Sequence, residues 1–316
     1  MDLVTLAEIR TAARRIAGTA RHTPLLPCPW AADGPLLVKP ENLQPVGAFK
    51  VRGATNRVAA LTPAERARGV ITHSSGNHGA ALAYAARAQG VPALVVLVDT
   101  TPQVKVDAVR ALGAEIVFTD PANRQADAER LAAERSMVLV PPFDDRYVIA
   151  GQGTIGLEIL ADAPDVAQVL VPVGGGGMAA GVAAVVKTLC PSVRVVGVEP
   201  ELAADARDSL RAGRRVQLPV EQRYRTVADG ARTELSELTW AHLRRYLDDI
   251  VVVSDGQLLD TVRTLALAAR LVVEPTGALA TAAFLHHPEL RTVGPTVAVI
   301  SGGNIDPQLL AEVLTK

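Results

Sequence analysis

The chain of 316 residues has little cysteine, few aromatic side chains and almost no net charge. Its formal charge is −1, so it lacks the basic excess that nucleic-acid-binding proteins use to neutralise phosphates. The two cysteines, Cys28 and Cys190, lie far apart without the spacing of metal ligands, which favours two reduced thiols. With 49% hydrophobic and 21% charged residues, the composition fits a globular enzyme for small molecules.

Long apolar runs are also lacking. No segment is long enough to cross a bilayer, and charged residues interrupt the first twenty positions, where a signal peptide would need an apolar core. We therefore expect a cytoplasmic protein with no membrane partner and no nucleic-acid partner. Lysine is scarce as well, so a lysine in an unusual context is of interest. Only five of the 32 basic residues are lysines: Lys39, Lys50, Lys105, Lys187 and Lys316.

Apolar runs alternate with alanine-rich stretches of helical spacing along the whole chain. Runs that are apolar at successive positions are typical of strands covered on both faces. The alternation predicts an α/β protein with two doubly wound parallel-sheet domains, in which ligands bind at the carboxyl ends of strands. The predicted strands are Leu36–Val38, Val70–Thr72, Ala93–Val98, Glu115–Phe118, Met137–Val140, Val169–Val173, Val193–Val198, Ile250–Val253 and Val297–Ile300.

Four consecutive glycines, Gly174, Gly175, Gly176 and Gly177, follow one of these strands. A tight turn needs only one or two glycines, whereas four allow backbone N–H groups at a helix N-terminus to surround a phosphate. The segment also fits a dinucleotide-binding fingerprint, with a carboxylate at the end of the next strand to bind a ribose. From this region alone, a nicotinamide-dependent oxidoreductase is an alternative.

Three further segments combine glycine with reactive or polar side chains. Lys50 follows Phe49 at the start of a helical stretch, where a helix dipole disfavours a cation; burial would free its amine for Schiff-base formation. In 74–79, Ser74 or Ser75 would cap a helix, and the exposed amides of Ser74, Ser75, Gly76 and Asn77 would hold a carboxylate. A turn at 301–304 follows the last strand.

Together these segments resemble the fold-type-II pyridoxal-phosphate (PLP) enzymes, of the tryptophan synthase β type, and among them the serine/threonine dehydratases and serine racemases. The resemblance covers nearly the whole chain. A nicotinamide-dependent reading explains neither the lysine segment nor the turn after the last strand. The matching segments are 39–44, 47–53, 74–79, 148–154, 174–177, 228–230 and 301–304.

The resemblance implies a role for each site residue. Lys50 would bind PLP as a Schiff base, with Phe49 beside the ring. Asn77 would bond the ring's phenolic oxygen, and Ser301 the pyridine nitrogen. Ser75 would act on the face opposite Lys50. The phosphate would be held by Gly174, Gly175, Gly176, Gly177 and Met178.

The resemblance also implies elimination of water from serine, threonine or a related β-hydroxy amino acid, giving a 2-oxo acid and ammonia. Serine racemase and hydroxyaspartate dehydratase are alternatives. Glu199, Ala203 and Asp205 resemble a divalent-cation site for Mg²⁺, Ca²⁺ or Mn²⁺, although two solvated acids would show the same spacing.

The resemblance predicts a homodimer and a discontinuous domain organisation. Residues 1–68 and 146–316 would form a large PLP-binding domain, and residues 69–145 a small domain that closes over the substrate. The cofactor would lie in the cleft between them. Val46 and Ala48 stand where the family usually has hydroxyl residues, so the choice of substrate stays open.

Overall fold

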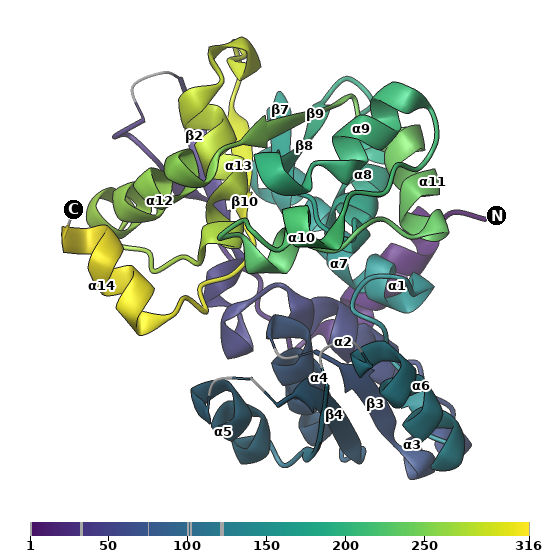
Figure 1. The fold of residues 1–316 in the computed structure, drawn as a ribbon. Coiled ribbons are helices and arrows are strands. Elements are labelled where there is room, and N and C mark those ends of the chain that lie inside the picture. The colour runs from purple at the N-terminus through teal and green to yellow at the C-terminus, as the bar shows by residue number, and fades with distance from the viewer. Residues whose placement is uncertain are drawn as a thin grey trace.

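The computed structural model describes residues 2–31, 34–74, 76–99, 101, 103–120 and 123–315. Its strands form two separate β-sheets (Figure 1). The six-stranded sheet takes its strands from both ends of the sequence, and the four-stranded sheet takes its strands from the middle. This arrangement confirms the predicted α/β class with two parallel sheets.

The larger sheet is parallel except at one edge, where β1 (Leu26–Pro27) runs antiparallel to β2 (Leu36–Pro40). β1 is not among the predicted strands, because two residues are too few to show a period. After β2 come β10 (Thr296–Ile300), β7 (Gln168–Pro172), β8 (Arg194–Pro200) and β9 (Asp249–Val253).

The smaller sheet is entirely parallel. Adjacent residues of one strand contribute to different hydrophobic clusters: Val95 belongs to one cluster, and Leu94 and Val96 belong to another. The exact domain boundaries at 68/69 and 145/146 stay predictions. The strand order is β5 (Glu115–Thr119), β4 (Ala93–Val98), β3 (Val70–His73) and β6 (Val138–Leu139).

Helices cover both faces of the larger sheet. Val169 and Val171 point into one hydrophobic cluster, whereas Leu170 between them points into another. Both faces are therefore buried, which explains the continuous apolar runs. The first cluster includes residues of α1 (Leu6–Ile16), α7 (Arg146–Asp162), α8 (Gly177–Leu189) and α11 (Glu237–Tyr246), and the second those of α12 (Asp255–Thr264), α13 (Pro275–His286) and α14 (Pro307–Thr315).

Helix α2 (Lys50–Ala59) links the two sheets, because it packs against both α7 and α4 (Asn77–Ala88). Figure 1 shows α2 between the upper and lower parts of the molecule. Across the described part of the chain, no helix is long and apolar enough to span a membrane. The remaining helices are α3 (Pro63–Arg68), α5 (Gln103–Ala111), α6 (Arg124–Glu134), α9 (Asp205–Ala212) and α10 (Val220–Arg223).

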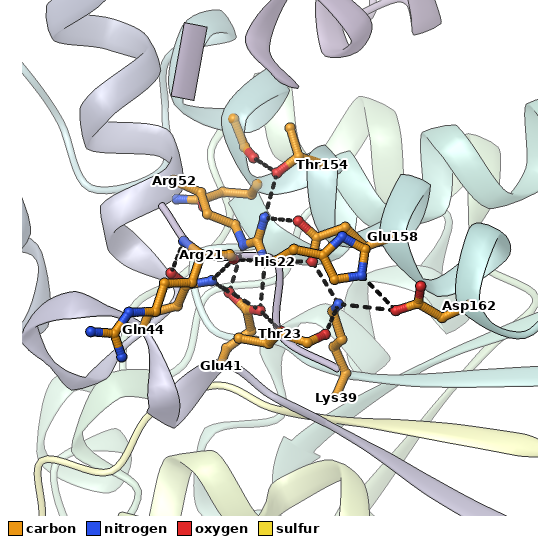
Figure 2. Close-up of polar contacts among 12 residues, drawn as sticks. Arg21, His22, Thr23, Lys39, Glu41, Gln44, Arg52, Thr154, Glu158 and Asp162 are labelled. Atoms are coloured by element: carbon orange, nitrogen blue, oxygen red, sulfur yellow. Dashed lines mark hydrogen bonds and ion pairs between the residues drawn. The ribbon is translucent and has the colours of Figure 1, made fainter. Parts of the chain in front are cut away.

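A buried ion network holds α2 in place (Figure 2). The Arg52 guanidinium donates to both oxygens of Glu41 at 2.6 and 2.8 Å, and to both oxygens of Glu158 at 2.6 and 2.8 Å. Lys39 Nζ donates to Glu158 at 2.6 Å. Arg52, Lys39 and Glu41 each have 0% exposure. The network thus connects α2 to α7 and to the end of β2.

The charges of this network balance locally. Burial by itself lowers the pKa of Arg52, but the adjacent Glu41 and Glu158 carboxylates outweigh that effect and raise it. Arg52 also donates to Thr154 Oγ1 and to the Arg21 carbonyl, so each N–H of the guanidinium has an acceptor. Such a network adds little net stability when intact, but losing one partner is costly.

Replacing Arg52 tests this network. Arg52→Met should lower the free energy of unfolding by about 3–5 kcal/mol, because the buried Glu41 would lose its cation and Glu158 would be left with Lys39. Arg130→Met is the matched control, since it removes an exposed ion pair with Glu134 on α6. The control should cost about 0.5 kcal/mol or less. Urea unfolding measures both; equal losses would show that the network is no stronger than a surface pair.

Candidate active site

The segments that carry Lys50 and Ser301 lie side by side, although they come from opposite ends of the sequence. Phe49 N donates to the Ser301 carbonyl at 3.0 Å, and Gly303 N donates to the Gly47 carbonyl at 2.9 Å. Ala48 and Gly302 form an antiparallel bridge between these contacts. The turn after β10 is therefore bound directly, backbone to backbone, to the segment that carries Lys50.

Lys50 is the first residue of α2, and its amine is largely shielded from water. Nζ donates to the Pro142 carbonyl at 2.7 Å and lies 5.0 Å from the centroid of the Phe49 ring. Burial lowers the pKa of Lys50 to about 8. Since the neutral amine is the nucleophile, far more of Lys50 is reactive near neutral pH than of an exposed lysine.

The tetraglycine turn after β7 leaves no room for side chains. Gly176 has a φ of +84° and directly precedes the first residue of α8. A Cβ on Gly175 would lie 2.4 Å from the Phe143 ring, and a Cβ on Gly174 would lie 2.8 Å from Ala231 Cα. Backbone N–H groups at the start of α8 have no acceptor within the helix, so the turn suits an anion.

Two asparagines and a glutamate form a hydrogen-bonded chain beside these segments. Asn77 Nδ2 donates to Glu274 Oε1 at 2.7 Å, and Asn304 Nδ2 donates to Asn77 Oδ1 at 2.7 Å. Glu274 is 5% exposed and is absent from the sequence prediction. The signal that would have indicated it is a carboxylate directly after the apolar run 271–273, where a buried side chain is expected.

Comparison with known proteins identifies the cofactor of this arrangement. The sequence profile of the family described as "Pyridoxal-phosphate dependent enzyme" matches residues 16–302. The chain belongs to the PLP-dependent enzymes. It is 39% identical to L-threo-3-hydroxyaspartate ammonia-lyase of Saccharomyces cerevisiae, over 100% of this chain and 98% of that protein.

Two other comparisons agree with this membership. The chain is 38% identical to L-threonine ammonia-lyase of Thermotoga maritima, over 99% of this chain and 79% of the relative. Its fold matches the solved structure of maize serine racemase with a TM-score of 0.94 and 35% identity, over 99% and 98% of the two chains. Membership of the PLP-dependent enzymes decides against the nicotinamide-dependent alternative.

The residues present fit the PLP that this family uses. PLP carries an aldehyde, a phosphate and a ring nitrogen, and the structure offers a partly buried amine, a turn without side chains and a hydroxyl. Ser301, which supplies the hydroxyl, is 3% exposed, and its Oγ has no hydrogen-bond partner among the described residues. Met178 lies in the hydrophobic core at the start of α8, so only its backbone would face a phosphate.

Of the two serines before α4, the structure describes Ser74. Ser74 Oγ accepts from Gly76 N at 3.3 Å, within a local turn. The N-cap of α4 is Gly76 without a side-chain cap, so the predicted capping role is wrong for Ser74. Its hydroxyl accepts instead from the amide of Gly76, which precedes the first helical residue, Asn77. Ser75 lies outside the described residues.

The predicted cation ligands are buried rather than solvated. Glu199 and Asp205 are each 1% exposed, which contradicts the alternative of two surface acids. Glu199 accepts from Ala206 N and Arg207 N at 2.9 and 2.7 Å, whereas Asp205 Oδ1 has no partner. Burial, and then the neighbouring Asp205, raise the pKa of Glu199. Among the described residues, no group of three or more His, Cys, Asp or Glu side chains is arranged so that it could hold a metal ion.

Gly176→Ala tests the glycine turn against a matched glycine. Gly176 and Gly213 both have positive φ, but an added Cβ meets Leu235 Cδ2 at 2.7 Å only at Gly176 and nothing within 4 Å at Gly213. Gly213→Ala should cost about 1–2 kcal/mol of stability from backbone strain alone. Gly176→Ala should cost more and also weaken PLP binding. Thermal unfolding and PLP titration compare them; equal PLP affinity would contradict the phosphate assignment.

The pH dependence of PLP capture tests the environment of Lys50. Only the neutral amine reacts with an aldehyde, so the capture rate should rise with pH and level off above the Lys50 pKa of about 8. An exposed lysine would continue to gain reactivity up to about pH 10.4. Stopped-flow absorbance of the cofactor-free protein measures the profile. A rate that keeps rising well above pH 8 would show that Lys50 is not shielded.

Proposed function

We propose that this PLP-dependent enzyme eliminates water from a small L-β-hydroxy amino acid, serine or threonine, and yields a 2-oxo acid and ammonia. The observation that carries the proposal is the shielded Lys50 amine beside the Phe49 ring, on a segment whose Phe49 N–H donates to the Ser301 carbonyl. Two relatives named ammonia-lyases, one for threonine and one for hydroxyaspartate, support elimination as the reaction.

Each part of the site would hold one part of the cofactor. Lys50 would bind the aldehyde of PLP, and Phe49 would lie beside the ring. Asn77 would donate to the ring oxygen, and Ser301 would pair with the ring nitrogen. When bound, PLP withdraws electrons from the α-carbon of the substrate and so makes its proton acidic. The phosphate would bind the backbone N–H groups of Gly174, Gly175, Gly176, Gly177 and Met178.

Lys50 would also move the proton. Its lowered pKa leaves part of the amine neutral at neutral pH, as a base that removes an α-proton requires. The backbone amides of 74–77, at the start of α4, would hold the substrate carboxylate. Ser75 would face the substrate from the side opposite Lys50, a proposal that rests on the sequence alone. A serine hydroxyl there would allow racemisation as a second activity.

A substrate panel tests the proposed reaction. Each molecule of L-serine or L-threonine consumed should yield one molecule of 2-oxo acid and one of ammonia. Lys50→Ala should lower this activity by at least about 10³-fold, because the substitution removes both the PLP anchor and the base. Chiral chromatography of the same samples measures racemisation, and threo-3-hydroxyaspartate extends the panel. Turnover that survives in Lys50→Ala would overturn the assignment.

We also propose that Glu199 and Asp205, with the Ala203 carbonyl between them, bind Mg²⁺, Ca²⁺ or Mn²⁺. Two buried carboxylates, one with an unpaired oxygen, favour a hard cation. A cation bound only by the folded protein would stabilise it. Chelation should therefore lower the melting temperature of the parent protein, by about 2–4 °C for each kcal/mol of stability lost. The melting temperature of the Asp205→Asn variant should be the same before and after chelation. Identical melting before and after exhaustive chelation would remove the proposal.

The assembly and location of the enzyme stay proposals as well. We propose a homodimer in the cytoplasm, with the domain boundaries given above. Both cysteines are free thiols, as in a reducing compartment. Leu43 and Val272 are 42% and 50% exposed on segments joined by a hydrogen bond from Asn42 Nδ2 to the Val272 carbonyl, and such apolar side chains suit a subunit contact. Sedimentation velocity measures the oligomeric state.

A further inference from the structure

Glu274 is a buried carboxyl group that the proposed reaction does not use. It precedes α13 as the N-cap residue, but its side chain caps nothing. The carboxyl instead turns toward the site: a Cβ on Gly302 would lie 2.2 Å from Glu274 Oε1 and 3.2 Å from Asn77 Nδ2. Glu274 N also donates to the Gly302 carbonyl at 3.1 Å. The carboxyl group therefore lies between the residue that follows Ser301 and the side chain of Asn77.

The hydrogen bonds fix the direction of each amide in this chain. The Val46 carbonyl can only accept, so Asn304 presents Nδ2 to it at 2.8 Å, and the same Nδ2 donates to Asn77 Oδ1. Asn77 must then turn Nδ2 toward Glu274, whose carboxylate can only accept. Among the described residues, Glu274 is the one acceptor recorded for Asn77 Nδ2, which leaves its second N–H for a ligand.

We infer that Glu274 is a positioning residue of the PLP site: it holds the Asn77 side-chain amide in one orientation, with one N–H directed at the cofactor's ring oxygen. The inference rests on the proposed role of Asn77 in binding PLP. Asn77 begins α4 in the middle of the sequence, whereas Glu274 and Asn304 come from the C-terminal part. The same three side chains therefore join the start of α4 to the larger sheet.

The charges around Glu274 make its hold on Asn77 depend on pH. Burial, and then Asp229, raise the pKa of Glu274 to about 7, while Asn77 and Lys105 act in the opposite direction. Lys105 on α5 lies 3.9 Å from Asp229, and both side chains are partly exposed. Above its pKa, Glu274 is a charged and therefore stronger acceptor. The hydrogen bond from Asn77 to Glu274 should therefore weaken as the pH falls through about 7, and Asn77 should be held less firmly in its orientation.

Pyridoxine 5′-phosphate tests the inference without catalysis. It keeps the ring oxygen and the phosphate of PLP but has an alcohol in place of the aldehyde, so it cannot react with Lys50. Calorimetric titration of the cofactor-free protein should show affinity rising about fivefold as the pH increases through 7, because the charged acceptor then holds Asn77. Glu274→Gln should bind more weakly above pH 7 and lose this pH step, since an amide oxygen accepts but does not titrate.

Two surface variants give the test a second arm if Glu274→Gln fails to fold. Asp229→Asn removes a neighbouring negative charge and should move the midpoint of the step below that of the parent. Lys105→Met removes a positive charge and should move it above. A step that persists in Glu274→Gln, or a midpoint unmoved by both surface variants, overturns the inference. If the parent protein does not turn over the substrate panel but binds pyridoxine 5′-phosphate with the expected pH dependence, the proposed reaction is wrong and the role of Glu274 stands.

Discussion

The pairing of Arg52 with two carboxylates is the constraint on which the rest of the structure depends. The guanidinium lies fully buried, with Glu41 and Glu158 on segments far apart in the sequence. Such a pair is stable only when each hydrogen bond is made, so it permits one relative placement of α2, α7 and the end of β2. Lys50 lies two residues before Arg52 on α2 and takes its position from that placement.

The reactive amine is held in a setting that costs stability. Lys50 is the first residue of a helix and is shielded from water, and both conditions disfavour its cationic form. A hydrogen bond to the Pro142 carbonyl compensates only in part. The buried network of Arg52, two residues further along α2, fixes the helix that carries the amine. Helix α2 thus carries both the ion pairs that fix its position, at Arg52, and the reactive amine of Lys50.

The site is assembled from the ends of strands in both sheets. Ser301 follows β10, the glycine turn follows β7, and Asn77 follows β3 of the smaller sheet. Hydrogen bonds across the junction run from Asn304 through Asn77 to Glu274. Any movement of the smaller sheet relative to the larger one must break or stretch this chain. The geometry of the cofactor site therefore depends on the relative position of the two sheets.

The sequence by itself determined the described strands other than β1, the α/β class and the residues with unusual chemistry. Apolar runs such as Ala93–Val98 predict buried strands because both faces of each sheet are covered, and consecutive glycines are too costly to occur without a use. Lys50 was identifiable because, in a chain with few lysines, it stands at a helix start within a glycine-flanked segment.

Only the tertiary structure decided which of these residues meet. The partners of Asn77, the pairing of Arg52 and the burial of Glu199 depend on contacts between segments distant in sequence, for which local periodicity carries no signal. Glu274 shows this most clearly. Its sequence neighbours suggest a helix start, and only packing against Gly302 and Asn77 turns its carboxyl group into the site.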